Sequence, residues 1–398
     1  MQFDVVVIGA STAGLHAAQK LVKAGKKVAI FDRQQKIRPA RRTLIVTPEL
    51  RRTLPEFPED MILHRTGTMR LSSASVTREV QLNDPDLIVD RAQITQWLLS
   101  KACEAGAEVF LGPRFVSFGS NVDRSNGNKS FVPIHFHNRG SCTVFATEAV
   151  IGADGINSSV ARAAGMVLPS SVPIVQAEVA LPLGWDPNVT QVWFDSEETR
   201  FFYWLIPESS EKGVAGLVGD DGTQTRELLA DFLNRQNLKP NSYQGAKVAM
   251  HHPGFQPWGN VENLPLYLVG DAAGHVKITT VGGSVTGFQG ANAVVRSILN
   301  GNSYKTEFRF TKRELDLHWF IRWMLDRLDN RGYDLLVSAV SSDVKDFLAC
   351  HNRDSMASVT WRLPFIEPQL IRVALQCLRG IAKSYSYTRS LGRFGTTP

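Results

Sequence analysis

Residues 3–32 of this 398-residue chain spell FDVVVIGASTAGLHAAQKLVKAGKKVAIFD, and this stretch decides the fold. The apolar run over 3–8 has the length of a strand and the composition of one that is buried on both faces of a parallel sheet. Over 14–23 the apolar residues recur at helical spacing, and a second strand-like run over 27–31 ends at Asp32. Two strands joined through a helix within about 30 residues predict a βαβ unit with a right-handed crossover.

The loop between the first strand and the helix, residues 9–14 (GASTAG), lies where a dinucleotide-binding fingerprint is expected. Gly9 permits a tight turn and Gly14 lets the helix approach the strand, while the small Ser11 replaces the middle glycine. The helix N-terminus offers N–H groups to a pyrophosphate. Asp32 ends the next strand, where a carboxylate accepts hydrogen bonds from a ribose. The unit therefore predicts a bound dinucleotide.

Two later segments distinguish the kind of dinucleotide. Residues 150–155 (VIGADG) form a strand that breaks at Asp154 and Gly155, and residues 266–274 (LYLVGDAAG) form a strand that delivers Asp271 followed by small residues. Each alone is compatible with an ordinary turn. An Asp at a strand end can accept a hydrogen bond from a ribityl hydroxyl, and a following helix can present its N-terminus to the cofactor. The three motifs in this order favour FAD over NAD.

The motif order resembles the FAD-dependent reductase and monooxygenase superfamily with the p-hydroxybenzoate hydroxylase fold. The stretch GDAAGHVKITTVGGSVTGFQGA, residues 270–291, is similar to the geranylgeranyl reductase branch, which typically writes GDAAGxVKxTTGGG. Residues 202–207 (FYWLIP) resemble the YxWxFP strand of that branch, and residues 315–350 resemble its helical tail. The resemblance therefore covers most of the chain.

The resemblance implies an α/β protein, α+β overall, with a Rossmann-type FAD-binding domain, an inserted antiparallel β-sheet substrate domain and a helical C-terminal region. The alternating pattern over 172–219 agrees with antiparallel strands. The expected FAD-binding domain comprises residues 1–70, 90–165 and 262–305. The expected substrate domain comprises 71–89 and 166–261, and the helical region comprises 306–398.

The resemblance also implies a role for individual residues. Asp32 would hold the AMP half of FAD, Asp271 the ribityl chain, and Gly282 and Gly283 would pass beneath the isoalloxazine. The whole implied FAD-binding set is Gly9, Ser11, Thr12, Ala13, Gly14, Asp32, Arg33, Arg42, Arg91, Asp154, Gly155, Gly270, Asp271, Gly282 and Gly283. The implied substrate-binding set is Phe202, Trp204, Ile206 and Pro207. No catalytic acid can be named, and no metal site is expected.

One loop departs from the family pattern. Many members carry KPCGGGL, whereas residues 38–44 of this chain are RPARRTL. Ala40 stands in place of the cysteine, so no mechanism through that thiol is available. Arg41 and Arg42 stand in place of two glycines, and they are compatible either with a solvated loop or with contact to an FAD phosphate or an acidic substrate head.

Other side chains also keep two interpretations. Trp204 is compatible with a plain core position and with a cavity wall. His275 is compatible with a structural role at a helix start and with a proton donor near the flavin. Lys277 is compatible with a surface lysine and with a group that binds a substrate head, the flavin or a nicotinamide phosphate.

The segment 370–383 has the pattern of an amphipathic helix. Its apolar face would carry Ile371, Ala374, Leu375 and Leu378, and its polar face Arg372, Gln376, Arg379 and Lys383. Such a helix either docks on the protein through its apolar face or lies on a membrane surface with its basic residues toward anionic lipid. The sequence alone leaves both possibilities open.

Composition limits the environment of the protein. The four cysteines form no CxxC pair, so they predict reduced thiols and not a disulfide framework or a zinc site. The sequence contains no run of about 18 apolar residues, so it predicts no membrane span. The formal net charge of +6 is mild, and nothing in the pattern indicates a nucleic-acid partner. We therefore expect a cytoplasmic protein, with peripheral contact to a membrane surface left open.

The function that the resemblance implies is FAD-dependent reduction of carbon–carbon double bonds in an apolar, prenyl-type substrate, with or without an anionic head. NAD(P)H or another electron donor, including a donor protein, would reduce the flavin. The alternatives are a flavin-dependent monooxygenase or halogenase that uses O2 on an aromatic substrate, and a flavin-binding scaffold without turnover. Residues 202–207 also resemble the WxWxIP of halogenases, but no clear counterpart of the halogenase lysine loop is present.

Overall fold

The computed structural model describes residues 1–37, 42–120, 132–138, 140–220 and 222–384. The chain forms two compact units. Unit 1 comprises Met1–Arg65, Asp86–Val172 and Ala246–Trp319, and unit 2 comprises Thr66–Pro85, Pro173–Gly245 and the chain from Phe320 onward. The C-terminal helices thus belong to the same unit as most of the antiparallel strands, whereas the sequence expectation set residues 306–398 apart.

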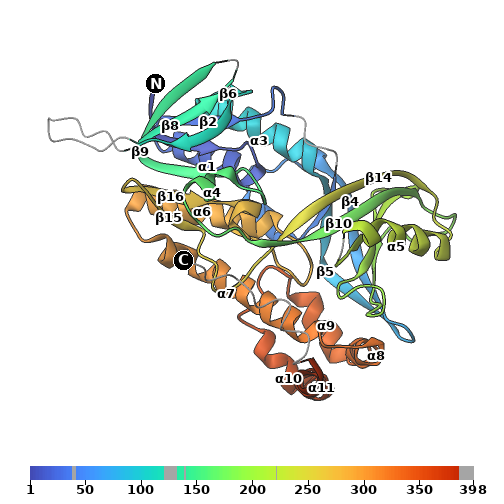
Figure 1. Cartoon of the computed structure of the whole chain (residues 1–398). Coiled ribbons are helices and arrows are strands. Elements are labelled where there is room, and N and C mark those ends of the chain that lie inside the picture. The colour runs from blue at the N-terminus through green and yellow to red at the C-terminus, as the bar shows by residue number, and fades with distance from the viewer. Residues whose placement is uncertain (38–41, 121–131, 139, 221, 385–398) are drawn as a thin grey trace. The chain divides into compact units, whose positions relative to one another are not determined.

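Unit 1 is built on an eight-stranded sheet whose central strands are parallel (Figure 1). The strand order is β15-β16-β9-β1-β2-β6, and β7 and β8 extend the sheet from β9. The pairs β1–β2, β1–β9, β9–β16 and β2–β6 are parallel, as the βαβ pattern predicts. The strands are β1 (Gln2–Ile8), β2 (Val28–Asp32), β6 (Glu108–Leu111), β7 (Arg114–Phe118), β8 (Val132–His137), β9 (Ser141–Gly152), β15 (Trp258–Val261) and β16 (Leu264–Leu268).

Strand β1 is buried on both faces, which confirms the sequence prediction. Val5 and Val7 pack into a core shared with the helices α1 (Thr12–Lys23), α3 (Arg91–Ala105) and α6 (Ser284–Asn300). Val6 and Ile8 point to the opposite face, where they pack with β8 and the short helix α4 (Ser159–Ala163). A strand covered on both sides needs apolar side chains at every position, which is why this run shows no alternation.

The helix ends of unit 1 follow their capping residues. Helix α3 begins after Asp90, whose carboxylate accepts from Ala92 N, and it ends at Gly106 with φ 103°. Helix α6 begins at Ser284 and ends at Gly301 with φ 70°. The remaining short helices of this unit are α2 (Glu49–Thr53), η1 (Glu59–Met61) and η2 (Gly270–Ala273).

The second sheet has the strand order β14-β10-β13-β12-β11-β4-β5-β3. The neighbouring pairs β10–β13, β13–β12, β12–β11 and β5–β3 are antiparallel, which confirms the alternating pattern over 172–219. Helix α5 (Gly222–Arg235) covers one face in unit 2. The strands are β3 (Thr43–Val46), β4 (Ile62–Ser72), β5 (Thr77–Asp90), β10 (Ser170–Ala180), β11 (Val189–Trp193), β12 (Tyr203–Pro207), β13 (Lys212–Val218) and β14 (Pro240–Met250).

Helices follow from residue 304 onward. They are α7 (Tyr304–Leu325), α8 (Asn330–Ser338), α9 (Ser342–Cys350), η3 (Thr360–Arg362), α10 (Leu363–Ile366) and α11 (Gln369–Ser384). Within the described ranges, no helix combines the length and the apolar content needed to cross a bilayer. Cys103, Cys350 and Cys377 carry free thiols.

Candidate functional site

The turn after β1 requires glycine at its first position. Gly9 has φ 102°, and its N–H donates to the Phe31 carbonyl oxygen over 2.7 Å. A Cβ placed on Gly9 would lie 2.7 Å from the backbone nitrogen of Asp154, closer than real Cβ atoms approach. The ends of β1 and β9 therefore touch backbone to backbone, and only glycine fits between them.

Ser11 explains why the middle glycine of the fingerprint is absent. Ser11 is the N-cap of α1 with φ −72°, and its hydroxyl accepts from Gly14 N over 3.3 Å. The backbone there is ordinary, so no glycine is required. Thr12 and Ala13 begin the helix, and their N–H groups have no carbonyl four residues back to bind. They are the donors available to a pyrophosphate at this helix end.

Gly14 lets α1 lie directly on the sheet. A Cβ on Gly14 would lie 2.6 Å from the Ala153 Cβ and 2.9 Å from the Gly9 carbonyl oxygen. The first turn of α1 is therefore held against the ends of both β1 and β9. This confirms the close helix–strand approach that the sequence predicts for Gly14.

Asp32 is fixed by backbone donors on both of its oxygens. Oδ2 accepts from Ala10 N and Oδ1 accepts from Gln34 N, each over 2.8 Å. Because an ionised carboxylate has about four acceptor sites, it retains capacity for ribose hydroxyls. The adjacent Arg33 is exposed.

The Asp154 carboxylate is used within the protein. It accepts from Ser158 Oγ at 2.6 Å, from Ser159 N at 2.7 Å, from Ser159 Oγ at 2.8 Å and from Val160 N at 3.2 Å. These bonds cap the start of α4. Gly155 follows with φ 83°, a conformation that favours glycine. The motif thus shapes the turn after β9, and a direct cofactor contact through this carboxylate stays a prediction.

The GDAAG segment lies against the N-terminus of α1. Gly270 has φ 64°, and a Cβ on it would meet the Ala13 Cβ at 3.5 Å. A Cβ on Gly287 of α6 would lie 3.7 Å from the Gly270 Cα. Three elements far apart in the sequence therefore meet with no bulky side chain between them. This small-residue seam brings the predicted residues 9–14 and 270–271 together.

Asp271 lies in the electrostatic field of two arginines. It is densely surrounded by protein although part of its side chain stays accessible, and this burial raises the pKa of the carboxyl while Arg91 and Arg42 oppose the shift. Burial likewise lowers the pKa of Arg42, with Arg91 adding to the effect and Asp271 opposing it. The Arg91 N–H donates to the Arg42 carbonyl oxygen over 2.9 Å. Arg42, Arg91 and Asp271 thus form one cluster, while Arg41 lies outside the described residues.

The turn that carries Gly282 and Gly283 is held from several sides. Lys277 N donates to the Gly282 carbonyl oxygen over 3.0 Å, and a Cβ on Gly283 would meet Val276 Cγ2 at 2.9 Å. Val281, which stands where the family pattern has the first of its three glycines, has φ 54°. A β-branched residue in this conformation is strained. Such strain persists only where the surroundings impose it.

Helix α7 provides one of these restraints, which the sequence did not reveal. The Thr279 hydroxyl hydrogen-bonds to Nδ1 of the buried His318, whose Nε2 lies 3.4 Å from a Glu314 oxygen. Lys277 is also buried, at 5% exposure, so the interpretation as a plain surface lysine is wrong. The only signal for these contacts in the sequence is helical spacing from 314 to 318.

His275 occupies a wholly enclosed position. A Cβ on Gly290 would overlap its ring, Phe308 packs at 4.7 Å between ring centroids, and the Tyr304 hydroxyl lies 3.3 Å from Nε2. Burial lowers the pKa of His275 to about 3, and His251 adds to this effect. The neutral, enclosed ring fits the structural interpretation of this residue.

We expect His275 to make unit 1 sensitive to acid. In the unfolded chain the histidine titrates near pH 6.5, so its stabilising effect is complete above that pH and is lost as the pH falls toward 3. The slope is about 1.4 kcal/mol per pH unit, or about 2 kcal/mol between pH 6.5 and 5. Urea unfolding of His275→Gln and of the parent protein at both pH values measures this difference. Equal pH dependence in the two proteins would contradict the assignment.

In unit 2 the strand β12 divides its side chains between two faces. Tyr203 and Leu205 pack with Phe232 of α5. Trp204 alternates to the other face, where a Cβ on Gly216 of β13 would overlap its indole.

The predicted substrate-binding residues are therefore not all on one face. Phe202 and Ile206 share the face of Trp204, and the rings of Phe202 and Trp204 lie 6.0 Å apart. Pro207 has the parity of Leu205 on β12, so it lies on the strand face opposite to that of Trp204, and its contact with substrate stays a prediction.

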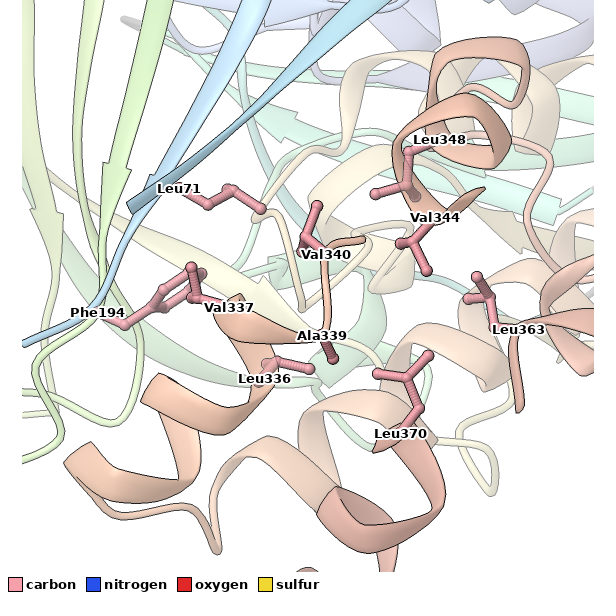
Figure 2. A pocket seen from close by; sticks show the side chains of 10 residues that line it. All are labelled: Leu71, Phe194, Leu336, Val337, Ala339, Val340, Val344, Leu348, Leu363 and Leu370. Carbon is pink, nitrogen blue, oxygen red and sulfur yellow. The ribbon is translucent and has the colours of Figure 1, made fainter. Parts of the chain in front are cut away.

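Unit 2 also contains an apolar cavity of about 200 Å³ (Figure 2). Every lining residue is apolar, and most come from the C-terminal helices: Leu71, Phe194, Leu336, Val337, Ala339, Val340, Val344, Leu348, Leu363 and Leu370. Phe194 joins the cavity to the aromatic face of β12, because its ring lies 6.5 Å from that of Phe202. The sequence did not reveal this cavity, because its walls come from segments almost 300 residues apart in the chain.

Comparison with known proteins agrees with the site in unit 1. A protein-family model described as FAD binding domain matches residues 2–252. The digeranylgeranylglycerophospholipid reductase of Methanocaldococcus jannaschii is 24% identical over 87% of this chain and 90% of its own length. The geranylgeranyl diphosphate reductase of Rhodobacter capsulatus is 29% identical over 69% of this chain and 70% of its own length.

Solved structures show the same fold. A geranylgeranyl bacteriochlorophyll reductase-like protein from Thermoplasma acidophilum superposes with a TM-score of 0.76 at 19% identity, over 94% of this chain and 99% of that protein. A flavin-dependent brominase variant superposes with a TM-score of 0.70 at 15% identity, over 93% of this chain and 98% of that protein. At these identities the likeness establishes the fold and leaves the reaction to be argued from the site.

Proposed function

Because the chain belongs to the FAD binding domain family and is an FAD-dependent oxidoreductase of the geranylgeranyl reductase type, we propose that it reduces carbon–carbon double bonds of an apolar, prenyl-type substrate. Reduced flavin would supply hydride to the double bond, and an acid or water would supply the proton. NAD(P)H or a donor protein would reduce the flavin. The redox chemistry belongs to the cofactor, and the protein contributes binding, orientation and a water-poor site.

The residues of unit 1 fit FAD. The N–H groups at the start of α1 are suited to the pyrophosphate, and Asp32 to the ribose of the AMP half. Asp271 lies beside that helix end and between two cations, where a carboxylate can accept from a ribityl hydroxyl while its charge is compensated. In this proposal Arg42 and Arg91 keep the polar end of the site positive, which also suits an anionic substrate head.

The observation that carries the choice of substrate is the cavity in unit 2. Its lining has no polar side chain, and an apolar cavity of ~150 Å³ is already enough to stay dry and bind a benzene-sized molecule. At about 200 Å³ it is smaller than a typical ligand pocket of ~300–1,000 Å³, so it suits part of a branched chain and not a whole substrate. The curated relatives are named as reductases of such chains.

An anaerobic half-reaction tests the proposal. The flavin is reduced, excess donor is removed, and geranylgeranyl-type alkenes of different head groups are added without O2. We expect the flavin to reoxidise only with an alkene, and the product to gain two hydrogens by mass spectrometry. Reoxidation that requires O2 would instead support a monooxygenase or halogenase, a reaction class represented by the brominase of the same fold. Absence of flavin reoxidation under both conditions would support a flavin-binding scaffold without turnover.

Filling the cavity tests its part in substrate binding. Ala339 lines the cavity, and Ala339→Phe should occupy much of its volume. We expect a raised KM for long prenyl chains and a smaller effect for short ones, because overpacking excludes the chain end first. The same substitution at Ala374, which lies on α11 but outside the cavity lining, is the control. Equal KM values in the two variants would show that the cavity does not take part in substrate binding.

Asp32→Ala should weaken FAD binding by about 1.5–3 kcal/mol, the usual contribution of a hydrogen bond to a charged group. The variant also loses the acceptors for Ala10 N and Gln34 N. Asp32→Asn is the control, because it keeps one oxygen and the side-chain shape. Flavin fluorescence titration measures the FAD affinity of both variants. Unchanged affinity in Asp32→Ala would mean that Asp32 only ends the strand and does not bind the cofactor.

A further inference from the structure

We propose that residues 361–375 form a face that docks on an anionic lipid surface, next to the wall of the apolar cavity. The docking face consists of Trp361, Phe365, Ile371 and Leu375, whose side chains are 61%, 81%, 47% and 48% exposed. All four lie on η3, α10 and α11, in one stretch of fifteen residues that belongs to unit 2. Scattered single apolar residues are normal on a surface, but a gathering of this kind marks an interaction site.

Helix α11 carries two apolar stripes with different environments. Val373 and Cys377 are buried against Leu328 and Tyr333, and Leu370 lines the cavity. Ile371 and Leu375, one turn apart, remain exposed. Of the two possibilities that the sequence leaves open for this apolar face, docking on the protein does not apply to Ile371 and Leu375. The helix is already anchored through one stripe, so the exposed stripe is not needed for that anchoring.

The aromatic pair at the start of the face is preorganised. The rings of Trp361 and Phe365 meet edge to face at 6.3 Å between centroids, and Trp361 Nε1 donates to the Ser358 carbonyl oxygen over 3.0 Å. The Arg362 guanidinium lies 5.5 Å from the Trp361 ring centroid. Ring faces beside a cation combine apolar area with a charged rim, as residues at a membrane–water interface do.

The charge of the residues around the docking face favours a lipid surface as its partner. Among the described side chains of residues 355–377, Arg362 and Arg372 are basic and exposed, and Glu367 is the one acidic group. Glu367 is buried and accepts from Gln369 N at the start of α11. The exposed Arg362 and Arg372 therefore meet no acidic neighbour within this stretch. Apolar side chains with a basic rim suit a bilayer with anionic head groups.

The docking face and part of the cavity lining come from neighbouring residues of the same short segments. Leu363 and Leu370 line the cavity (Figure 2), and each is close in sequence to an exposed member of the docking face. A chain leaving the bilayer would therefore meet apolar side chains on α10 and α11 both outside and inside the protein. The choice of a lipid as partner rests on the apolar substrate proposed above. The exposure of the docking face is an observation that does not depend on that proposal.

Flotation of the full chain with vesicles tests the docking face. We expect the FAD-loaded protein to float with phosphatidylcholine vesicles that contain phosphatidylglycerol. The double variant Trp361→Ser/Phe365→Ser should partition about tenfold less or worse, because it loses two interfacial aromatic groups. Leu183→Ser, which removes a fully exposed leucine from the β10–β11 loop, is the matched control and should float like the parent. Unchanged flotation of the double variant would overturn the proposal.

Two further measurements separate the alternatives. Arg362→Gln/Arg372→Gln should bind the anionic vesicles more weakly and lose the salt dependence, since charge attraction at a surface is screened by salt. Sedimentation velocity of the parent and the Trp361→Ser/Phe365→Ser variant reveals self-association. A parent dimer that the double variant dissociates would make this face a contact between copies of the chain and overturn the lipid proposal.

The docking face and the proposed reaction can fail independently. With substrate dispersed in detergent, the Trp361→Ser/Phe365→Ser variant should turn over substrate at the parent rate. With substrate embedded in vesicles, its rate should fall by about the same factor as its vesicle binding. Binding to vesicles without turnover of any alkene would refute the reaction and retain the docking face. Turnover at equal rates from vesicles would refute the docking face and retain the reaction.

Discussion

A protein carrying Gly9→Ala should purify without bound flavin. The new Cβ would press on the backbone of Ala153 and Asp154, which belongs to the turn after β9 and cannot rotate away as a side chain could. Overpacking of this kind costs about 1–3 kcal/mol, and a left-handed backbone costs a further ~1–2 kcal/mol for a residue with a Cβ. The turn after β1 would have to shift, and with it the N–H groups at the start of α1. Absorbance of flavin relative to protein after purification measures the effect.

The control for this variant is Gly25→Ala. Gly25 has φ 85°, close to the conformation of Gly9, but a Cβ there meets nothing within 4 Å. It therefore imposes the backbone strain without the clash. We expect Gly25→Ala to keep its flavin and to lose only a small part of its thermal stability. If both variants lose flavin equally, the close approach at Gly9 is not what shapes the cradle.

Trp204→Ala should slow substrate-dependent flavin reoxidation by at least ~10-fold while FAD stays bound. The predicted FAD-binding residues all belong to unit 1, whereas Trp204 belongs to unit 2 on the face that connects to the cavity through Phe202 and Phe194. Removing a buried ring leaves a void, and both the chain-binding wall and the packing over Gly216 are lost. The stability of unit 2 should also fall, by about 3–5 kcal/mol as for other buried aromatic residues.

Tyr203→Ala separates the effect on the substrate from the effect on folding. Tyr203 is the next residue on β12, is equally buried, and faces Phe232 of α5 on the opposite side of the sheet. Its loss should destabilise unit 2 to a similar degree without altering the face of Trp204. Rates are compared per mole of bound flavin, with the melting temperature of each variant measured in parallel. Equal slowing in both variants would return Trp204 to a purely structural role.

Much of unit 1 could be predicted from the sequence because its determinants are local. The βαβ unit follows from apolar runs of strand length on either side of a helical pattern, and the structure confirms each of these elements. Gly9 and Gly270 are also local requirements, since a left-handed backbone restricts the residue at one position. The start of α6 at Ser284 has no such local mark, because Gly283 offers no capping side chain.

The tertiary structure alone decided which side chains meet. Arg42, Arg91 and Asp271 are far apart in the chain, and no periodicity predicts that burial would bring their charges together. The Asp154 carboxylate accepts hydrogen bonds at the start of α4, which its motif did not reveal, and its contact with the cofactor stays a prediction. The sequence left two interpretations open for His275 and Lys277; packing against α6 and α7 encloses His275, and Lys277 is buried as well.

The same division holds in unit 2. Sequence determined that residues 203–207 form a strand and that 369–384 form an amphipathic helix, because strand alternation and helical spacing are properties of the local backbone. Which stripe of that helix is buried depends on the partner that it meets, and Leu328 and Tyr333 select the stripe of Val373 and Cys377. The cavity exists only where β4, Phe194 and the C-terminal helices come together. Such long-range packing leaves no periodic signal in the chain, and therefore only the folded structure reveals it.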